Sequence, residues 1–153
     1  MKYTVITFGC RVNQADSLGF EEKLRATGAV SVPAEEADLV VVNTCSVTAT
    51  SDQGARQTIR RVARENPAAR IVVTGCYATR RPGEMAALPN VAAVVPNDDK
   101  PQLMSLIRRA REGDGPCGAP IEPGLAGRTA YTLRVQTGCA EPCSYCIIPA
   151  TRG

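Results

Sequence analysis

The sequence contains no histidine and no tryptophan among its 153 residues, and aromatic residues make up only 4% of it. Without histidine, the common zinc sites that combine cysteine with histidine are excluded. The scarcity of aromatic side chains argues against the base-stacking surfaces on which proteins bind single-stranded nucleic acids. No hydrophobic run approaches the roughly 18 residues that a membrane-spanning helix needs, and no signal peptide is visible, so we expect a cytoplasmic protein without a membrane partner.

The remaining composition is ordinary for a globular protein, since 44% of the residues are hydrophobic and 22% are charged. The net charge of +3 is too small to indicate a nucleic-acid partner by itself. The length fits one domain, or one domain followed by a fragment of another. Seven cysteines without a secretion signal indicate a reducing compartment, in which thiols bind metal or react more often than they form disulfides.

Short apolar runs alternate with helix-like patterns over residues 1–112. The runs expected to form strands lie at 3–8, 38–43, 70–74 and 91–95, with a minor strand at 29–32. Helices are expected at 14–27, 48–65, 83–88 and 100–112. Near-continuous apolar runs are typical of strands that are covered on both faces. The pattern therefore predicts a doubly wound α/β domain whose mainly parallel, flavodoxin-like sheet has flanking helices.

Helical spacing also predicts which side chains lie on the apolar faces of these helices. In the helix over 48–65, one face is expected to carry Ala55, Ile59 and Val62. In the helix over 100–112, the side chains expected to face inward are Leu103, Leu106 and Ile107. The helix over 14–27 carries Ala15, Leu18 and Leu24 at helical spacing and is expected to end at Gly28.

The composition changes at 113–128, where half of the sixteen residues are glycine or proline. That composition is typical of a linker. A following run at 130–136 predicts one further strand. The expected organisation is therefore an α/β domain at 1–112, a linker at 113–128 and the truncated beginning of a second domain at 129–153. Since a lone strand cannot satisfy its edge hydrogen bonds, we expect 129–153 to be weakly ordered or to borrow a neighbour.

Cys139, Cys143 and Cys146 form a Cys-x3-Cys-x2-Cys run, which we call the second cysteine set. Three such thiolates can hold three irons of a 4Fe–4S cluster and leave the fourth iron open to a cofactor. A structural zinc site needs four ligands, and a disulfide framework suits short secreted chains, so the spacing favours the cluster over both alternatives. Cys117, in the linker, has no partner at ligand spacing and is not expected to be a ligand.

Cys10, Cys45 and Cys76, the first cysteine set, are far apart in the sequence, but each follows an expected strand. Parallel strands end at one edge of their sheet, so the three thiols are expected to meet there. Gly9 and Gly75 would allow tight turns beside them. Three cysteines without histidine again fit a 4Fe–4S cluster with one open iron, and isolated buried cysteines remain the alternative.

Two groups of polar residues have roles that the sequence leaves open. Asn13, Asn43 and Thr44 flank the first cysteine set; they either cap helix starts, which is the favoured interpretation, or donate hydrogen bonds to a cluster. The helix over 48–65 carries a stripe of arginines that either contacts RNA phosphates or forms a solvated face. Its members are Arg56, Arg60, Arg61 and Arg64.

Both cysteine sets and their surroundings resemble the methylthiotransferases, which are radical S-adenosylmethionine enzymes. The matching segments are TFGCRVNQADS (7–17), VNTCSVT (42–48), VTGCYA (73–78), 136–146 and PATRG (149–153). Arg-Val after Cys10 resembles the branch that acts on threonylcarbamoyladenosine in tRNA. The isopentenyladenosine branch usually has Gln-Met there, and a branch that modifies a ribosomal protein is the third possibility.

The resemblance implies an enzyme that adds a methylthio group to carbon 2 of N6-threonylcarbamoyladenosine next to the anticodon. It implies two 4Fe–4S clusters, of which the one on Cys139, Cys143 and Cys146 would bind S-adenosylmethionine and reduce it to a 5′-deoxyadenosyl radical. The cluster on the first cysteine set would present the sulfur. Tyr145 would lie near the adenine of S-adenosylmethionine, with simple packing as the alternative. The implied partners are the tRNA and an electron donor, and the oligomeric state is not indicated.

The family continues into a (β/α) barrel that binds S-adenosylmethionine and then a small RNA-binding domain. The chain is therefore expected to be a fragment that ends after the first strand and cluster loop of a truncated radical-SAM barrel, and to be inactive alone. Two other classes remain. One is a small iron–sulfur binding or electron-transfer module with a flavodoxin-like fold, and the other is a zinc-stabilised interaction protein.

Overall fold

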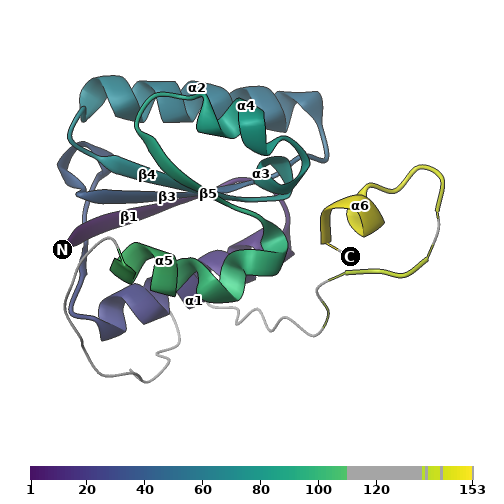
Figure 1. Ribbon diagram of the computed structural model, residues 1–153, viewed down its shortest axis with the longest axis horizontal. Helices are drawn as coiled ribbons and strands as arrows, with labels where there is room; N and C mark the ends of the chain where they lie inside the picture. The colour runs from purple at the N-terminus through teal and green to yellow at the C-terminus, as the bar shows by residue number, and fades with distance from the viewer. Residues whose placement is uncertain (110–135, 137, 142, 153) are drawn as a thin grey trace.

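The computed structural model describes residues 1–109, 136, 138–141 and 143–152. Within them, a parallel five-stranded sheet forms the centre, with the strand order β2-β1-β3-β4-β5 (Figure 1). The strands are β1 (Lys2–Thr7), β2 (Val30–Ser31), β3 (Leu39–Thr44), β4 (Arg70–Gly75) and β5 (Val91–Val95). The predicted doubly wound, parallel α/β fold is confirmed, and all five strands expected within residues 1–112 are present.

Helices cover both faces of this sheet (Figure 1). One face carries α2 (Ala49–Glu65), α3 (Cys76–Arg80) and α4 (Pro82–Ala86). The other carries α1 (Arg11–Ala26) and α5 (Leu103–Arg109). Two short 3-10 helices, η1 (Ala34–Glu36) and η2 (Asn97–Gln102), lie in connections, and α6 (Ile148–Arg152) lies beyond the edge of the sheet near α3. None of the helices in the described ranges is long and apolar enough to cross a membrane.

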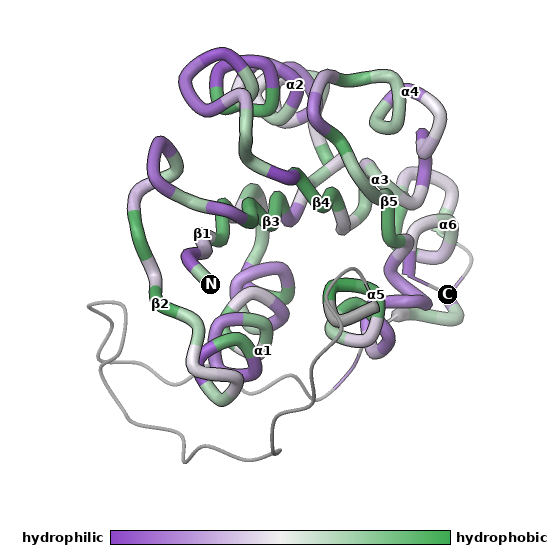
Figure 2. The backbone as a smooth tube through the Cα atoms, turned by 60° about the vertical axis from the view of Figure 1, so that its left-hand side comes forward, coloured by the Kyte–Doolittle hydropathy of each residue, from purple (hydrophilic) through white to green (hydrophobic). Residues whose placement is uncertain are grey.

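The apolar core has two halves, one on each side of the sheet. All six residues of β3 are buried, as expected for a central strand with helices on both faces. Alternate residues point to opposite halves, so Val40 and Val42 pack with α2 while Leu39 and Val41 pack with α1 and α5. Figure 2 shows the hydrophobic colour along the central strands and hydrophilic colour over much of α2. Each fully buried aliphatic side chain contributes roughly 1.5–3 kcal/mol to folding.

The predicted helix faces are partly right. Ala55, Ile59 and Val62 are buried together on α2, as the spacing indicated. The prediction for Leu106 is wrong, because this side chain is 39% exposed. In α5 the buried positions are 103, 104 and 107, which follow one helical face, and position 106 lies outside that face.

Helix α1 departs furthest from the expectation. Leu24 is fully buried, and the helix ends beside Gly28, whose φ is +74°. Ala15 and Leu18 are only half-buried, whereas the first two turns bury Asn13, Asp16 and Ser17. The amino end of α1 thus turns a polar face inward, toward the edge of the sheet where the strands end.

Several predicted features lie outside the described residues. These are the linker at 113–128 with Cys117, the end of the helix over 100–112, and the strand at 130–136 apart from Gln136.

Candidate functional site

The first cysteine set lies at one edge of the sheet, as predicted. Strands β1, β3 and β4 are neighbours, and Thr44 at the end of β3 is paired with Gly75 at the end of β4. Cys45 and Cys76 directly follow these paired residues, and Cys10 lies after β1 as the N-cap residue of α1. Cys45 and Cys76 are each only 4% exposed, whereas Cys10 is exposed. Parallel pairing therefore gathers the segments that carry all three cysteines.

Two glycines let these loops approach one another. Gly9 has φ +100°, and a Cβ there would lie 2.5 Å from Cys45 Cβ and 2.6 Å from Cys45 Sγ. Gly75 has φ +99°, and a Cβ there would lie 2.2 Å from the carbonyl oxygen of Thr44. Both the backbone conformation and the close contact require glycine. The loop after β1 is thus packed on Cys45, and the residue before Cys76 is packed on the residue before Cys45.

Buried amides fasten the same loops. Asn13 Nδ2 donates to the carbonyl oxygens of Phe8 (2.8 Å) and Thr44 (2.9 Å). Phe8 directly follows β1, and Thr44 is the last residue of β3. Asn43 Nδ2 donates back to the carbonyl oxygen of Asn13 (2.8 Å) and to Ser17 Oγ (3.0 Å). We call these two asparagines the amide clasp. They join the ends of β1 and β3 to the first turns of α1.

The favoured capping role is wrong for both asparagines, because their amides are used in these connections between strand ends and α1. It is right in part for Thr44. The Thr44 hydroxyl donates to the carbonyl oxygen of Thr74 (2.6 Å) and accepts from the backbone N–H of Ala78 (3.2 Å), in the first turn of α3. No helix was expected here, because α3 is only five residues long and follows β4 without a loop.

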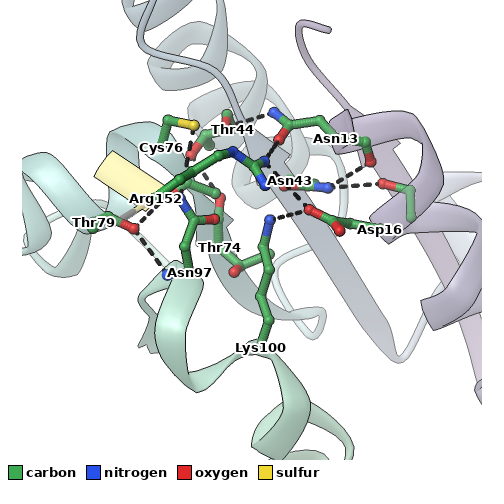
Figure 3. Close-up of polar contacts among 12 residues, drawn as sticks. Asn13, Asp16, Asn43, Thr44, Thr74, Cys76, Thr79, Asn97, Lys100 and Arg152 are labelled. Atoms are coloured by element: carbon green, nitrogen blue, oxygen red, sulfur yellow. Dashed lines mark hydrogen bonds and ion pairs between the residues drawn. The ribbon is translucent and has the colours of Figure 1, made fainter. Parts of the chain in front are cut away.

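A buried charge cluster lies beside Cys76 (Figure 3). Lys100 Nζ, from η2, is 2.5 Å from Asp16 Oδ2, and Arg152 Nη2, from α6, is 3.3 Å from the same oxygen. The side chains of all three residues are at most 5% exposed. Arg152 Nη2 also donates to Asn13 Oδ1, so the cluster adjoins the amide clasp.

The surroundings shift the pKa values of the two cations in opposite directions. Burial lowers the pKa of Lys100, and the charge of Asp16 offsets this only in part. Burial also acts to lower the pKa of Arg152, but the neighbouring Cys76 sulfur and Asp16 outweigh it, so this pKa is raised. Arg152 therefore stays charged next to Cys76.

Asn97 completes the surroundings of Cys76. Its Nδ2 lies 3.7 Å from Cys76 Sγ and donates to the carbonyl oxygen of Thr151 (2.6 Å). Its backbone N–H donates to Thr79 Oγ1 (2.9 Å). One side chain at the start of η2 thus contacts both the cysteine and α6.

The sequence analysis missed Asp16, Asn97 and Lys100. Asp16 did carry a local signal, since it follows Asn13 by three residues and so shares its helical face. Asn97 and Lys100 lie in a polar turn after Pro96, which gave no indication of a buried role.

The donor chemistry of this edge fits a thiolate-bound cluster. Two of the three thiols are buried, and one of these, that of Cys76, lies beside the N–H donor of Asn97 and the cation Arg152, which can offset thiolate charge. Over the described ranges, no three cysteine, aspartate, glutamate or histidine side chains are close enough together to hold a single metal ion. The structure thus brings the segments that carry Cys10, Cys45 and Cys76 to one edge of the sheet, and their role as ligands stays a prediction.

The second cysteine set lies in an exposed loop before α6. Cys143 is exposed, and Cys139 and Cys146 are half-buried. The N–H of Cys146 donates to the carbonyl oxygen of Cys143 (3.1 Å), which makes a local turn. Tyr145 is 90% exposed, so the packing alternative finds no support in its surroundings, and contact with adenine stays a prediction.

The arginine stripe of α2 is divided between two environments. Arg56 Nη1 donates to the hydroxyl of Tyr77, which in turn donates to Glu84 Oε2 (2.7 Å), and its guanidinium lies 5.6 Å from the Tyr77 ring centre. The other three arginines are exposed. With two neighbouring polar residues they line a hollow of about 470 Å³, whose lining is Gln57, Thr58, Arg60, Arg61 and Arg64.

Comparison with known proteins gives one family match and many relatives. The family model described as "Uncharacterized protein family UPF0004" matches residues 2–96. The threonylcarbamoyladenosine tRNA methylthiotransferase MtaB of Bacillus subtilis (strain 168) is 36% identical over 160 residues, which cover 96% of this chain and 36% of that protein.

Relatives with other substrates in their names are almost as similar. The ribosomal protein uS12 methylthiotransferase RimO of Pelotomaculum thermopropionicum is 34% identical over 170 residues, covering 100% of this chain and 38% of that protein. The tRNA-2-methylthio-N(6)-dimethylallyladenosine synthase of Sorangium cellulosum is 34% identical over 177 residues, covering 99% of this chain and 35% of that protein. The chain spans little more than a third of the length of these relatives.

Proposed function

Because the chain belongs to the UPF0004 family and to the methylthiotransferases, which it resembles along its whole length, we propose that it takes part in adding a methylthio group to carbon 2 of N6-threonylcarbamoyladenosine in tRNA. The observation that carries this proposal is that three cysteines far apart in the sequence follow neighbouring strands at one edge of the sheet, beside buried cations. In this proposal, residues 1–112 form the α/β domain of the first cluster, 113–128 a linker, and 129–153 the start of the radical S-adenosylmethionine region.

Each cysteine set would hold one 4Fe–4S cluster. Cys10, Cys45 and Cys76 would hold the first cluster, and Cys139, Cys143 and Cys146 would hold the second, with Tyr145 against S-adenosylmethionine. When bound, these groups would supply the radical chemistry that activates a carbon–hydrogen bond and the sulfur that replaces the hydrogen.

The chain's own residues fix the first set in place. Gly9 and Gly75 allow the loops to touch, and the amide clasp of Asn13 and Asn43 holds them in register. Arg152 and Lys100 place positive charge next to Cys76, where thiolates would otherwise repel one another. The edge therefore supports a negatively charged centre at modest electrostatic cost.

Metal analysis tests the cofactors. After anaerobic reconstitution of the full chain, we expect about eight irons and eight sulfides per molecule, as two three-cysteine sites imply. Alanine at all three positions of either set should lower both values to about four. Zinc in place of iron, or iron that neither triple variant lowers, would contradict the proposal.

Substrate assignment needs a separate test, because the relatives named for three substrates differ little in identity. Disrupting the gene in its host and analysing tRNA nucleosides by mass spectrometry should abolish the methylthio derivative of threonylcarbamoyladenosine. The methylthio derivative of isopentenyladenosine and the modification of ribosomal protein uS12 should remain. Loss of either of these modifications instead would assign the chain to the corresponding substrate. Both substrates are second candidates, because the chain is similar to the relatives named for them.

A further inference from the structure

Arg152 enters the sheet edge from a distant part of the sequence. It lies six residues beyond Cys146, yet its guanidinium contacts Asn13 and Asp16 near the start of α1. Its side chain is 2% exposed. Beside it, the carbonyl oxygen of Thr151 accepts from Asn97 Nδ2. The segment that follows the second cysteine set is thereby attached next to the first.

The guanidinium is not fully used by these contacts. Nε and Nη1 are buried and have no hydrogen-bond partner among the described residues. A buried donor without an acceptor costs about 1–3 kcal/mol, and more when the group is charged. Unused donors in such a place indicate that an acceptor belongs beside them. Asn97 Nδ2 contacts both Cys76 Sγ (3.7 Å) and the carbonyl oxygen of Thr151 (2.6 Å), so Cys76 lies beside the residue that precedes Arg152 (Figure 3).

The charges of the cluster lead to the same conclusion. Lys100 and Arg152 bring two positive charges, and Asp16 brings one negative charge, all buried at this edge. A buried excess of positive charge is unfavourable unless an anion neutralises it. The thiols of the first cysteine set, when ionised as metal ligands, are the nearby groups that would supply that anion.

We propose that Arg152 is a positioning residue with two roles. It anchors the segment after the second cysteine set at the first set, and its unused N–H groups donate hydrogen bonds to the thiolate sulfur of Cys76 when that sulfur binds the cluster. This inference rests on the proposed function, because it needs a cluster on Cys10, Cys45 and Cys76. Hydrogen bonds to sulfur and nearby positive charge both raise the reduction potential of an iron–sulfur cluster. Arg152 therefore sets the potential of the first cluster from the segment that carries the second.

The test uses the full chain with Cys139, Cys143 and Cys146 replaced by alanine, so that only the first cluster is titrated. In this background, Arg152→Gln should shift the midpoint potential of the cluster to a more negative value, as followed by electron paramagnetic resonance. Arg152→Lys keeps the charge but not the planar donor group, so its shift should be smaller. Arg25→Gln is the control. It removes the same charge in the last turn of α1, where Arg25 pairs with Glu21, and should cause no comparable shift of the midpoint potential.

Hydrogen exchange gives a second readout that does not need reduction of the cluster. The backbone amides of residues 147, 148 and 150–152 should exchange faster in Arg152→Gln than in the parent, because α6 loses its attachment. If Arg152→Gln assembles no cluster, the potential of Arg152→Lys decides.

Three results would overturn the inference. An unchanged midpoint potential in both Arg152 variants would overturn the inference, even if hydrogen exchange became faster, and it would leave the proposed clusters unaffected. A shift in Arg25→Gln as large as that in Arg152→Gln would show only a general charge effect. Failure of the parent background to bind iron would overturn both the inference and the first cluster itself.

Discussion

The two cysteine sets are built in opposite ways. The second set is compact in sequence, but short-range backbone hydrogen bonds join the described residues of its loop, and Cys143 is exposed. The first set is spread over three strands, yet glycine contacts, buried amides and a charge cluster surround it. The comparison indicates two ways to bring ligands together. Cysteines that are close in sequence need little support from the fold before a cluster binds, whereas cysteines that are far apart in sequence must be brought together by the fold.

The largest expected effect separates the two sets by single cysteine substitutions. Cys76→Ala should remove the first cluster and halve the iron content, and Cys143→Ala should halve it by removing the second. Only Cys76→Ala should also lower the stability of the metal-free chain, because Cys76 is 4% exposed and Cys143 is exposed. Iron analysis and urea unfolding of both variants measure this. Equal stabilities of the two apo variants would contradict the contrast.

The next effect concerns the backbone beneath the first set. Gly75→Ala places a Cβ 2.2 Å from the Thr44 carbonyl at a φ of +99°, so the free energy of unfolding should fall by about 3 kcal/mol or more. Gly19→Ala is the matched control, because nothing lies within 4 Å of a Cβ there. Alanine at this helical position should raise stability by about 0.5–1 kcal/mol. Urea unfolding curves give both values, and similar changes in the two variants would count against the packed edge.

A smaller loss is expected from opening the amide clasp. Asn13→Ala removes the buried donor to the carbonyl oxygens of Phe8 and Thr44, so stability should fall by about 1–3 kcal/mol. The first cluster should also assemble more slowly, while the second should be unaffected. Gln57→Ala, at an exposed position of α2, should change stability by less than about 0.5 kcal/mol. A neutral Asn13→Ala would mean that the strands alone hold the loops.

The smallest effect on either set is expected from the exposed arginines of α2. Helix α2 starts at the cysteine edge and runs back along the sheet, so Arg60, Arg61 and Arg64 lie about 16–22 Å along the helix from its start. Replacing all three by glutamine should leave the iron content unchanged. If these arginines contact tRNA phosphates, the affinity for tRNA should fall in the variant. The slope of the logarithm of the binding constant against the logarithm of the salt concentration should also decrease by up to about one unit per arginine. Unchanged affinity and slope would assign these residues to a solvated face.

Much of the fold could be predicted because its signals are local. The apolar runs of β1, β3 and β4 located the strands, and parallel pairing alone then placed Cys10, Cys45 and Cys76 at one edge. Gly9 and Gly75 were identified for the same reason, since a turn beside a strand end is a local requirement. These predictions depend on periodicity and residue type, both of which are visible in the sequence.

The rest of the site could not be predicted, because it depends on contacts without a period. Lys100 meets Asp16 across 84 residues, and Arg152 meets Asn13 across 139. The apolar pattern of α1 suggested Ala15 and Leu18, but the nearby polar cluster made the opposite positions the buried ones. Leu106 was misplaced because spacing alone cannot fix the rotation of a short helix.

If the first cysteine set binds a metal centre as proposed, the amide clasp has a consequence for how that centre assembles. One side chain, Asn13, holds backbone acceptors after β1 and at the end of β3, so neither loop can swing open without loosening the other. Release of Cys10 from a metal centre would therefore weaken the grip of Cys45 at the same moment. Metal binding at this set should therefore be cooperative. Cells grown with limiting iron should yield a mixture of metal-loaded and metal-free molecules, with few that carry a partly assembled cluster.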